Sequence, residues 1–240
     1  MIYITGDTHG EQDYGKIFNH RKMFKEEDIL IIAGDFGGIW DGSGRIIRKY
    51  EMLKCKVAFV DGNHENFDRL AEYPTEDMWG GKVQRISSNI VHLMRGEVYC
   101  IDGNKILTMG GASSIDKEDR LEEDRKKNLK RKKYSNKRIV KTWWEQEVPN
   151  KEDIDKLYSS IEKVGYKVDY IITHAIDNRV VEYLELKDKE EEDKEFSKAL
   201  EFMRHNVKYK KWYCGHYHKD VELVEEKVRV LFNDIIEIGR

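Results

Sequence analysis

Five short polar clusters, each at the end of an apolar run, constrain this chain more than any other feature. The runs at residues 2–5, 29–33, 57–60, 168–173 and 212–214 have the length and residue types of buried strands. The first three alternate with segments of helical spacing, which predicts crossover units and a mostly parallel sheet. Because ligands of such sheets bind beyond the carboxyl ends of the strands, we expect the clusters to form one site. The clusters are Gly6-Asp7-Thr8-His9-Gly10, Gly34-Asp35, Gly62-Asn63-His64-Glu65, Thr173-His174 and Gly215-His216-Tyr217-His218.

Shorter signals divide the rest of the chain. Beyond residue 78, closely spaced apolar runs surround Asp102-Gly103-Asn104, a cluster typical of a hairpin turn. A helix is predicted from a cap at Asn150 to about residue 164, and another over residues 196–205. Two runs that resemble antiparallel strands, residues 221–224 and 228–232, follow. We expect a single domain over residues 1–240, with a charged insertion at about 117–141.

The charges are distributed unevenly along the chain. It has 43 Lys and Arg and 46 Asp and Glu, for a net charge of −3. Residues 125–141 nevertheless hold ten basic side chains and no acid, so the remainder of the chain is acidic. Such a run attracts phosphate-rich polymers such as nucleic acid, although charged runs are often solvated insertions. Both interpretations stay open, and the shortage of aromatic residues beyond Tyr134 favours the second.

Composition and the first residues bear on location. No stretch approaches the roughly 20 apolar residues that a membrane-spanning helix requires, and the first residues show neither a basic region nor a cleavage site. The three cysteines, Cys55, Cys100 and Cys214, form no C-x-x-C pair and are expected to be buried thiols. We therefore expect a soluble, cytoplasmic protein without membrane contact.

The side chains of the five clusters are those that bind divalent metal ions. Asp7 and His9 are two residues apart, so on an extended backbone both point the same way, and His216 and His218 repeat this spacing. Nitrogen and oxygen ligands without a thiolate favour Mn, Fe, Zn or Ni over a sulfur-bound structural zinc. Seven candidates are too many for one ion with an open position and predict two ions that share a carboxylate. The candidates are Asp7, His9, Asp35, Asn63, His174, His216 and His218.

The five clusters, in this order, resemble the signature of the calcineurin-like metallophosphoesterase family over residues 7–218. The resemblance implies a four-layer α/β/β/α sandwich with mixed sheets and two divalent ions, with manganese preferred and iron, zinc or nickel as alternatives. His64 is implied to be the catalytic histidine, and Asp35 the residue that bridges the ions. The implied ligands are Asp7, His9, Asp35 and His218 for the first ion, and Asp35, Asn63, His174 and His216 for the second.

The expected activity is hydrolysis of a phosphoric ester. Two ions lower the pKa of a shared water, so that a bridging hydroxide attacks phosphorus while the ions hold the phosphate oxygens. His64 then protonates the leaving alkoxide. One alternative is a phosphodiesterase or nuclease that holds nucleic acid through residues 125–141. Another is a non-catalytic adaptor with the same fold, which the complete set of ligands argues against.

The sequence also departs from the family pattern. Many members have an aspartate three residues after the bridging one, which orients the catalytic histidine, and Gly38 stands here instead. Asp41 and Glu65 are the residues that we consider as substitutes. The family's protein Ser/Thr phosphatases carry an arginine just after this motif, and its absence argues against that specificity. Arg45 and Arg120 are candidates to bind a phosphate oxygen.

A second resemblance is to a smaller group of bacterial and phage phosphoesterases. The segments that carry it are Gly34-Asp35-Phe36-Gly37 with Trp40, residues 110–116, and Trp143-Trp144-x-x-Glu147-x-Pro149.

Overall fold

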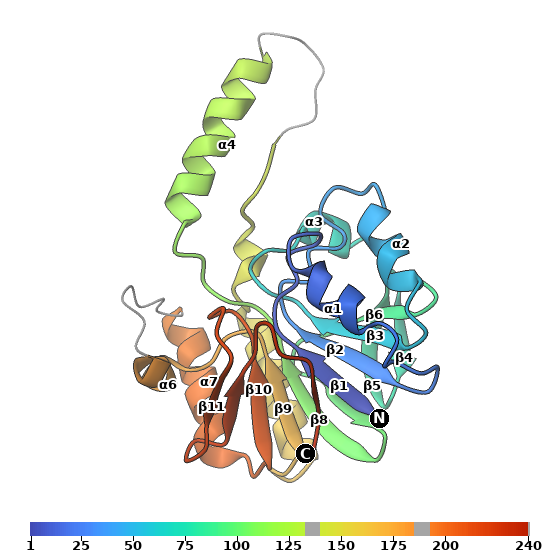
Figure 1. Ribbon diagram of the computed structural model, residues 1–240. Helices are drawn as coiled ribbons and strands as arrows, with labels where there is room; N and C mark the ends of the chain where they lie inside the picture. Colours follow the sequence, from blue (N-terminus) through green and yellow to red (C-terminus); the bar gives the residue numbers. More distant parts are fainter. Residues whose placement is uncertain (133–139, 185–192, 240) are drawn as a thin grey trace.

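Two mixed β-sheets form the centre of the computed structural model, which describes residues 1–132, 140–184 and 193–239 (Figure 1). The strands are β1 (Ile2–Thr5), β2 (Ile29–Ala33), β3 (Lys56–Val60), β4 (Thr75–Met78), β5 (Gly81–Arg85), β6 (Ile90–Leu93), β7 (Val98–Ile101), β8 (Asn104–Met109), β9 (Tyr170–Thr173), β10 (Lys211–Cys214), β11 (Val221–Leu223), β12 (Val228–Val230) and β13 (Ile236–Glu237). The helices are α1 (Tyr14–His20), α2 (Arg45–Glu51), α3 (Phe67–Leu70), α4 (Lys117–Lys132), α5 (Lys151–Lys163), α6 (Asn178–Val181) and α7 (Lys194–Asn206), with the short 3₁₀ helices η1 (Glu145–Glu147) and η2 (Glu182–Leu184).

Each sheet has a parallel centre and antiparallel edges. In the first sheet, with the order β13-β1-β2-β3-β6-β5-β4, the four strands from β1 to β6 run parallel, and the pairs β13–β1, β6–β5 and β5–β4 are antiparallel. The second sheet, with the order β11-β12-β10-β9-β8-β7, has four parallel strands between β11 and β7, which pair antiparallel. The parallel strands of one sheet therefore end at the same edge, as the sequence predicts.

Three apolar cores separate four layers. The central core joins residues of the first sheet, such as Ile31, to residues of the second, such as Ile172. A second core packs α1 and α2 against the outer face of the first sheet, with Tyr50 completely buried. A third core packs α5 and α7, with Leu157 and Leu200, against the outer face of the second sheet. This helix–sheet–sheet–helix order confirms the four-layer α/β/β/α sandwich (Figure 1).

Local sequence chemistry explains several element boundaries. The Asn150 side chain accepts the Asp153 amide at 3.0 Å and the Asp153 carboxylate accepts the Asn150 amide at 3.1 Å, a reciprocal cap that starts α5 where predicted. Asp102 and Gly103 have φ of 48° and 77° and join β7 to β8, which confirms the predicted hairpin. The β4–β5 hairpin is not predicted because its strands are largely polar.

One prediction about the thiols is wrong. Cys55 and Cys214 are buried, but Cys100 is exposed. It lies on β7, an edge strand of the second sheet, where buried and exposed side chains alternate. The alternation places Tyr99 and Ile101 in the core and leaves Cys100 on the solvent face.

The predicted charged insertion begins with α4, which stands out from the sandwich (Figure 1). Its 16 residues span about 24 Å. The chain that returns from it contacts the helix again, because Asn128 exchanges two hydrogen bonds with the backbone of Val140, and Asp124 accepts the Thr142 amide at 2.7 Å. Residues 133–139 of the predicted basic run lie outside the described residues. Within the described ranges, every helix is too short or too polar to span a membrane.

Candidate metal centre

The structure brings all seven predicted ligands and His64 into adjoining loops at the carboxyl ends of five parallel strands. Three of these strands belong to the first sheet and two to the second, so the site lies where the edges of both sheets meet. The residues follow β1 (Asp7, His9), β2 (Asp35), β3 (Asn63, His64), β9 (His174) and β10 (His216, His218).

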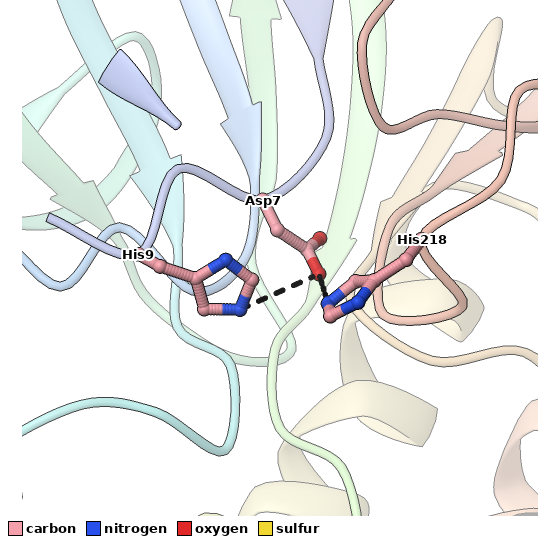
Figure 2. Close-up of side chains that lie close together, drawn as sticks. All are labelled: Asp7, His9 and His218. Atoms are coloured by element: carbon pink, nitrogen blue, oxygen red, sulfur yellow. Dashed lines mark ion pairs between the residues drawn. The ribbon is translucent and has the colours of Figure 1, made fainter. Parts of the chain in front are cut away.

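Asp7 offers one carboxylate oxygen to the backbone and the other to two imidazoles. Its side chain is completely buried, and Oδ1 accepts the His216 amide at 2.8 Å. Oδ2 lies 3.1 Å from Nε2 of His218 and 4.0 Å from Nε2 of His9 (Figure 2). One oxygen and two nitrogens thus converge from loops that are more than 200 residues apart in sequence.

Asp35 is arranged in the same way but faces histidines from both sheets. Its Oδ1 accepts the His64 amide at 2.7 Å. Its Oδ2 lies 3.3 Å from Nε2 of His9 and 3.4 Å from Nε2 of His174. A single carboxylate oxygen thus faces two imidazoles that come from different sheets.

Hydrogen bonds to the other ring nitrogen fix the orientation of two histidines. Nδ1 of His9 lies 2.7 Å from Oδ2 of Asp13, and Nδ1 of His174 lies 2.9 Å from the Ala33 carbonyl oxygen. A carbonyl and an ionised carboxylate only accept, so Nδ1 carries the proton in both rings. Nε2 is therefore the atom turned toward the carboxylates, an arrangement typical of histidines that bind metals.

The remaining two candidates cluster around His174. Oδ1 of Asn63 lies 3.1 Å from Nε2 of His174. The ring of His216 packs edge-on against the His174 ring, with centroids 4.9 Å apart. We call Asp35, Asn63, His174 and His216 the inner set. We call Asp7, His9, Asp35 and His218 the outer set, which shares Asp35 with the inner one.

Exposure differs between the sets. The side chains of Asp35 and His174 are 1% and 0% exposed, whereas His9 is 14% and His218 is 53% exposed. Among the described residues, three groups of acidic and histidine side chains have ligand atoms within 4.8 Å of one another. These groups are Asp7-His9-His218, His9-Asp35-His64 and Asp7-Asp35-His174.

The charge of the two buried carboxylates requires nearby positive charge. Burial disfavours the charged forms, yet the carboxylates of Asp35 and Asp7 outweigh it and raise the pKa of His9 to about 9 and that of His174 to about 10. Burial alone would raise the pKa of Asp7 and Asp35, but the facing His174 lowers both pKa values. The pKa of Asp35 is lowered further than that of Asp7. Without metal, protons on imidazole supply this charge, so the donor set fits divalent cations.

Close approach and backbone strain mark the same loops. A Cβ atom on Gly34 would lie 1.9 Å from Nδ1 of His174, and one on Gly62 would lie 2.1 Å from Oδ1 of Asp35. Glycine at these positions therefore makes room for the neighbouring side chain. Four candidate ligands adopt a left-handed backbone conformation that costs on the order of 1 kcal/mol each, as is common at functional sites. They are His9 (φ 41°), Asp35 (φ 48°), His216 (φ 68°) and His218 (φ 48°).

The structure explains Gly38 at the position of the family's orienting aspartate. A Cβ atom there would lie 2.3 Å from Cε1 of Phe36, whose buried ring stacks on Phe59 with centroids 4.4 Å apart. The ring of Phe36 thus fills the space that a larger side chain at residue 38 would need.

Neither predicted substitute orients His64 in the described part of the chain. The Asp41 carboxylate accepts the Ser43 amide at 2.8 Å on the surface, and the buried Glu65 accepts the Gly37 amide at 3.2 Å. Burial lowers the pKa of His64, and the carboxylates that oppose this effect belong to Asp35 and Asp116.

Sequence reasoning also missed residues that support the ligands. Asp13 follows His9 by four residues, a spacing that could have pointed to their contact. Lys16 donates from Nζ to the Asp7 carbonyl oxygen at 2.6 Å, and burial lowers its pKa to about 8. Ser114 contacts Asn63 from a distant loop, and no signal in the sequence connects the two.

A cavity of about 300 Å³ opens beside His9 of the outer set. His9, His64, Trp40, Ile46 and Arg45 are among the residues that line it. The guanidinium of Arg45 forms an ion pair with Glu11 and is exposed, so it can reach a ligand in this cavity. Arg120, the other predicted phosphate ligand, is instead bound to the buried Glu147 at 2.8 Å.

Comparisons with known proteins agree with this geometry at the level of the family. A family model described as calcineurin-like phosphoesterase matches residues 1–220. None of the curated proteins matches the sequence. A similar solved structure, from Staphylococcus aureus, is described as a candidate 5'-nucleotidase in complex with alpha-ketoglutarate. It is 12% identical with a TM-score of 0.46, and the match covers 96% of this chain but only 48% of that one, about half its length.

Proposed function

The chain belongs to the calcineurin-like phosphoesterase family, and from this premise we propose that it is a metal-dependent phosphoester hydrolase that works with two divalent ions. The inner set would hold one ion and the outer set the other, with manganese preferred and iron, zinc or nickel as alternatives. The observation that carries this proposal is the position of Asp35 Oδ2, between Nε2 of His9 and Nε2 of His174 at 3.3 and 3.4 Å.

Each group of the site then has a distinct task. When bound, the two ions would activate water and neutralise charge on the phosphate. The protein holds the ligand nitrogens ready through Asp13 and the Ala33 carbonyl. His64 follows Asn63 directly and lines the cavity, so its imidazole is placed to protonate the leaving oxygen of the ester.

The cavity of about 300 Å³ is where the leaving group would lie. Its walls combine the apolar side chains of Trp40 and Ile46 with the charged Arg45. This lining favours an organic leaving group with an apolar face over a short, fully hydrated one.

The test is hydrolysis by protein stripped of metal with a chelator. An aryl phosphate monoester and an aryl diester are assayed with Mn²⁺, Fe²⁺, Zn²⁺ and Ni²⁺, which also separates a phosphatase from a phosphodiesterase. We expect turnover only after a metal is restored. Hydrolysis that persists in chelator would contradict the two-ion proposal, and absence of hydrolysis with every metal would favour the adaptor alternative.

A second candidate function is cleavage of nucleic acid held by α4. The helix rises from the loop that follows strand β8, and the neighbouring strand β9 leads to His174 (Figure 1). A nucleic-acid chain bound along α4 would therefore lead toward the site. An observation against this candidate is that Lys126 and Lys127 form ion pairs with Glu122 and Glu123, which leaves less free positive charge on the helix.

Neutralising the basic face of α4 tests this candidate. Replacement of Arg125, Lys126, Lys127 and Lys130 by Gln should weaken cleavage of single-stranded DNA or RNA and its salt dependence, without changing aryl ester hydrolysis. The matched control replaces four exposed lysines elsewhere, Lys22, Lys25, Lys54 and Lys56. Equal effects of the two variants would remove α4 from the reaction.

A further inference from the structure

Ser114 joins the candidate ligand Asn63 to a buried carboxylate. Nδ2 of Asn63 donates to Oγ of Ser114 at 3.0 Å, and that hydroxyl donates to Oε2 of Glu147. Glu147 is completely buried and ends the short helix η1, whereas Ser114 precedes α4. The contact therefore links three loops at one edge of the sandwich.

The hydrogen bonds around Glu147 fix the direction of the Ser114 hydroxyl. Nη2 of Arg120 donates to Oε1 at 2.8 Å, and the Trp144 amide donates to the same oxygen at 3.3 Å. Both of these partners can only donate, and although burial raises the pKa of Glu147 to about 7, the carboxylate is ionised above that pH and then only accepts from Ser114. The Ser114 hydroxyl therefore donates its proton to Glu147. The lone pairs of Ser114 Oγ face Asn63 and Nη1 of Arg120, the latter at 3.0 Å.

This direction decides which end of the Asn63 amide faces the metal site. A hydroxyl that can only accept binds the NH₂ group and rejects the amide oxygen. Oδ1 of Asn63 must then point the other way, where it lies 3.1 Å from Nε2 of His174. An amide oxygen binds a metal ion, whereas an amide NH₂ group does not, so the orientation determines whether Asn63 can serve as a ligand.

We infer that Ser114 and Glu147 are positioning residues that hold the amide oxygen of Asn63 toward an ion in the inner set. This inference rests on the proposed function. It also gives a role to two residues that flank the charged insertion at about 117–141. Arg120 stabilises this arrangement because its guanidinium donates hydrogen bonds to Glu147, to Ser114 and to the Thr142 carbonyl oxygen.

The test measures Mn²⁺ binding to metal-free protein by calorimetry. Ser114→Ala removes the acceptor, and Glu147→Gln introduces an NH₂ group that can donate to Ser114 and free its proton for Asn63. Each should lower the affinity for one of the two ions about 10- to 100-fold and leave the other within twofold. Ser114→Thr keeps the hydroxyl and should restore the affinity.

A neighbouring serine supplies the matched control. Oγ of Ser113 accepts the Asp193 amide at 2.9 Å, and we expect Ser113→Ala to bind both ions like the wild type. Circular dichroism of the metal-free variants checks folding. Ser114→Ala and Ser114→Thr keep the Arg120–Glu147 pair, so they decide the matter if Glu147→Gln does not fold.

The outcomes separate this inference from the proposed function. Wild-type protein that binds fewer than two ions and hydrolyses no ester contradicts the proposed function itself. Wild-type protein that binds two ions, together with a folded Ser114→Ala variant of unchanged affinity, overturns only the role of Ser114. An equal loss of both ions in Ser114→Ala, or a Ser114→Thr variant as weak as Ser114→Ala, also overturns it.

Discussion

The inner and outer sets differ in how far the protein has prepared them. In the inner set, His174 is buried against the Ala33 carbonyl, and Asn63 is held by Ser114. In the outer set, His218 is 53% exposed and its ring stacks on Phe232 with centroids 4.7 Å apart. A ligand set that is already buried and oriented loses less conformational freedom when an ion binds. We therefore expect the inner ion to bind tightly and the outer ion to exchange.

Asp35 belongs to both sets, so replacing it should have the largest effect. Asp35→Asn removes the carboxylate that both sets share, so both ions should be lost and hydrolysis should fall at least about 1,000-fold. Metal analysis of dialysed protein and steady-state kinetics check this. The control is Asp41→Asn, an aspartate that lines the cavity beside His9 and contacts Ser43. Two retained ions in Asp35→Asn would contradict the bridging role.

His64 lies beside both sets but is proposed to bind neither ion. His64→Ala should keep both ions and lower turnover of alkyl phosphate esters roughly 10²- to 10⁴-fold, because their leaving groups need a proton. Aryl esters with good leaving groups should change far less. Unchanged turnover of the alkyl esters would remove His64 from the mechanism. Loss of an ion would instead make it a ligand, since its ring is near His9 and Asp35.

Single histidine variants sharpen the difference between the sets. His218→Ala should lower the affinity for the weaker ion about 10-fold or more and leave the tighter ion unchanged, because it touches only the outer set. His174→Ala should do the reverse. Calorimetric titration of both variants with Mn²⁺ gives the comparison, and it fails if either variant weakens the two ions equally.

In the metal-free protein, protons on the imidazoles of His9 and His174 should take the place of the metal charge, so its stability should depend on pH. The folded-state pKa values of His9 and His174 are raised to about 9 and about 10, so their contribution to stability is full below about pH 6.5. It is lost as pH rises through these values, by up to about 1.4 kcal/mol per pH unit for each proton. Melting temperatures should fall over this range without Mn²⁺ and fall less with it. Parallel curves would contradict the replacement of protons by metal.

The sequence could predict that the candidate ligands lie together, but not which residues support them. Asp7, Asp35 and His174 each follow an apolar strand, and parallel strands end at one edge, so local pattern brings them together. Ser114 meets Asn63 across 51 residues, and only the folding of two loops makes that contact. The same holds for Gly38, because the sequence shows a missing aspartate, whereas the structure shows the Phe36 ring in its place.

The layers of the fold were equally predictable for a physical reason. Strands such as β2 are buried along their whole length, and such runs are typical of parallel sheets covered on both faces. The largely polar β4 and β5 carry no such signal. The position of α4 also lies beyond local pattern, since it depends on contacts such as that between Asp124 and Thr142.

Titration of metal-free wild-type protein with Mn²⁺ tests the central claim most directly. The account predicts two ions per chain with clearly separated affinities, of which only the tighter survives in His218→Ala. A single bound ion, or two ions whose affinities are equal and respond alike to His218→Ala and His174→Ala, would contradict it.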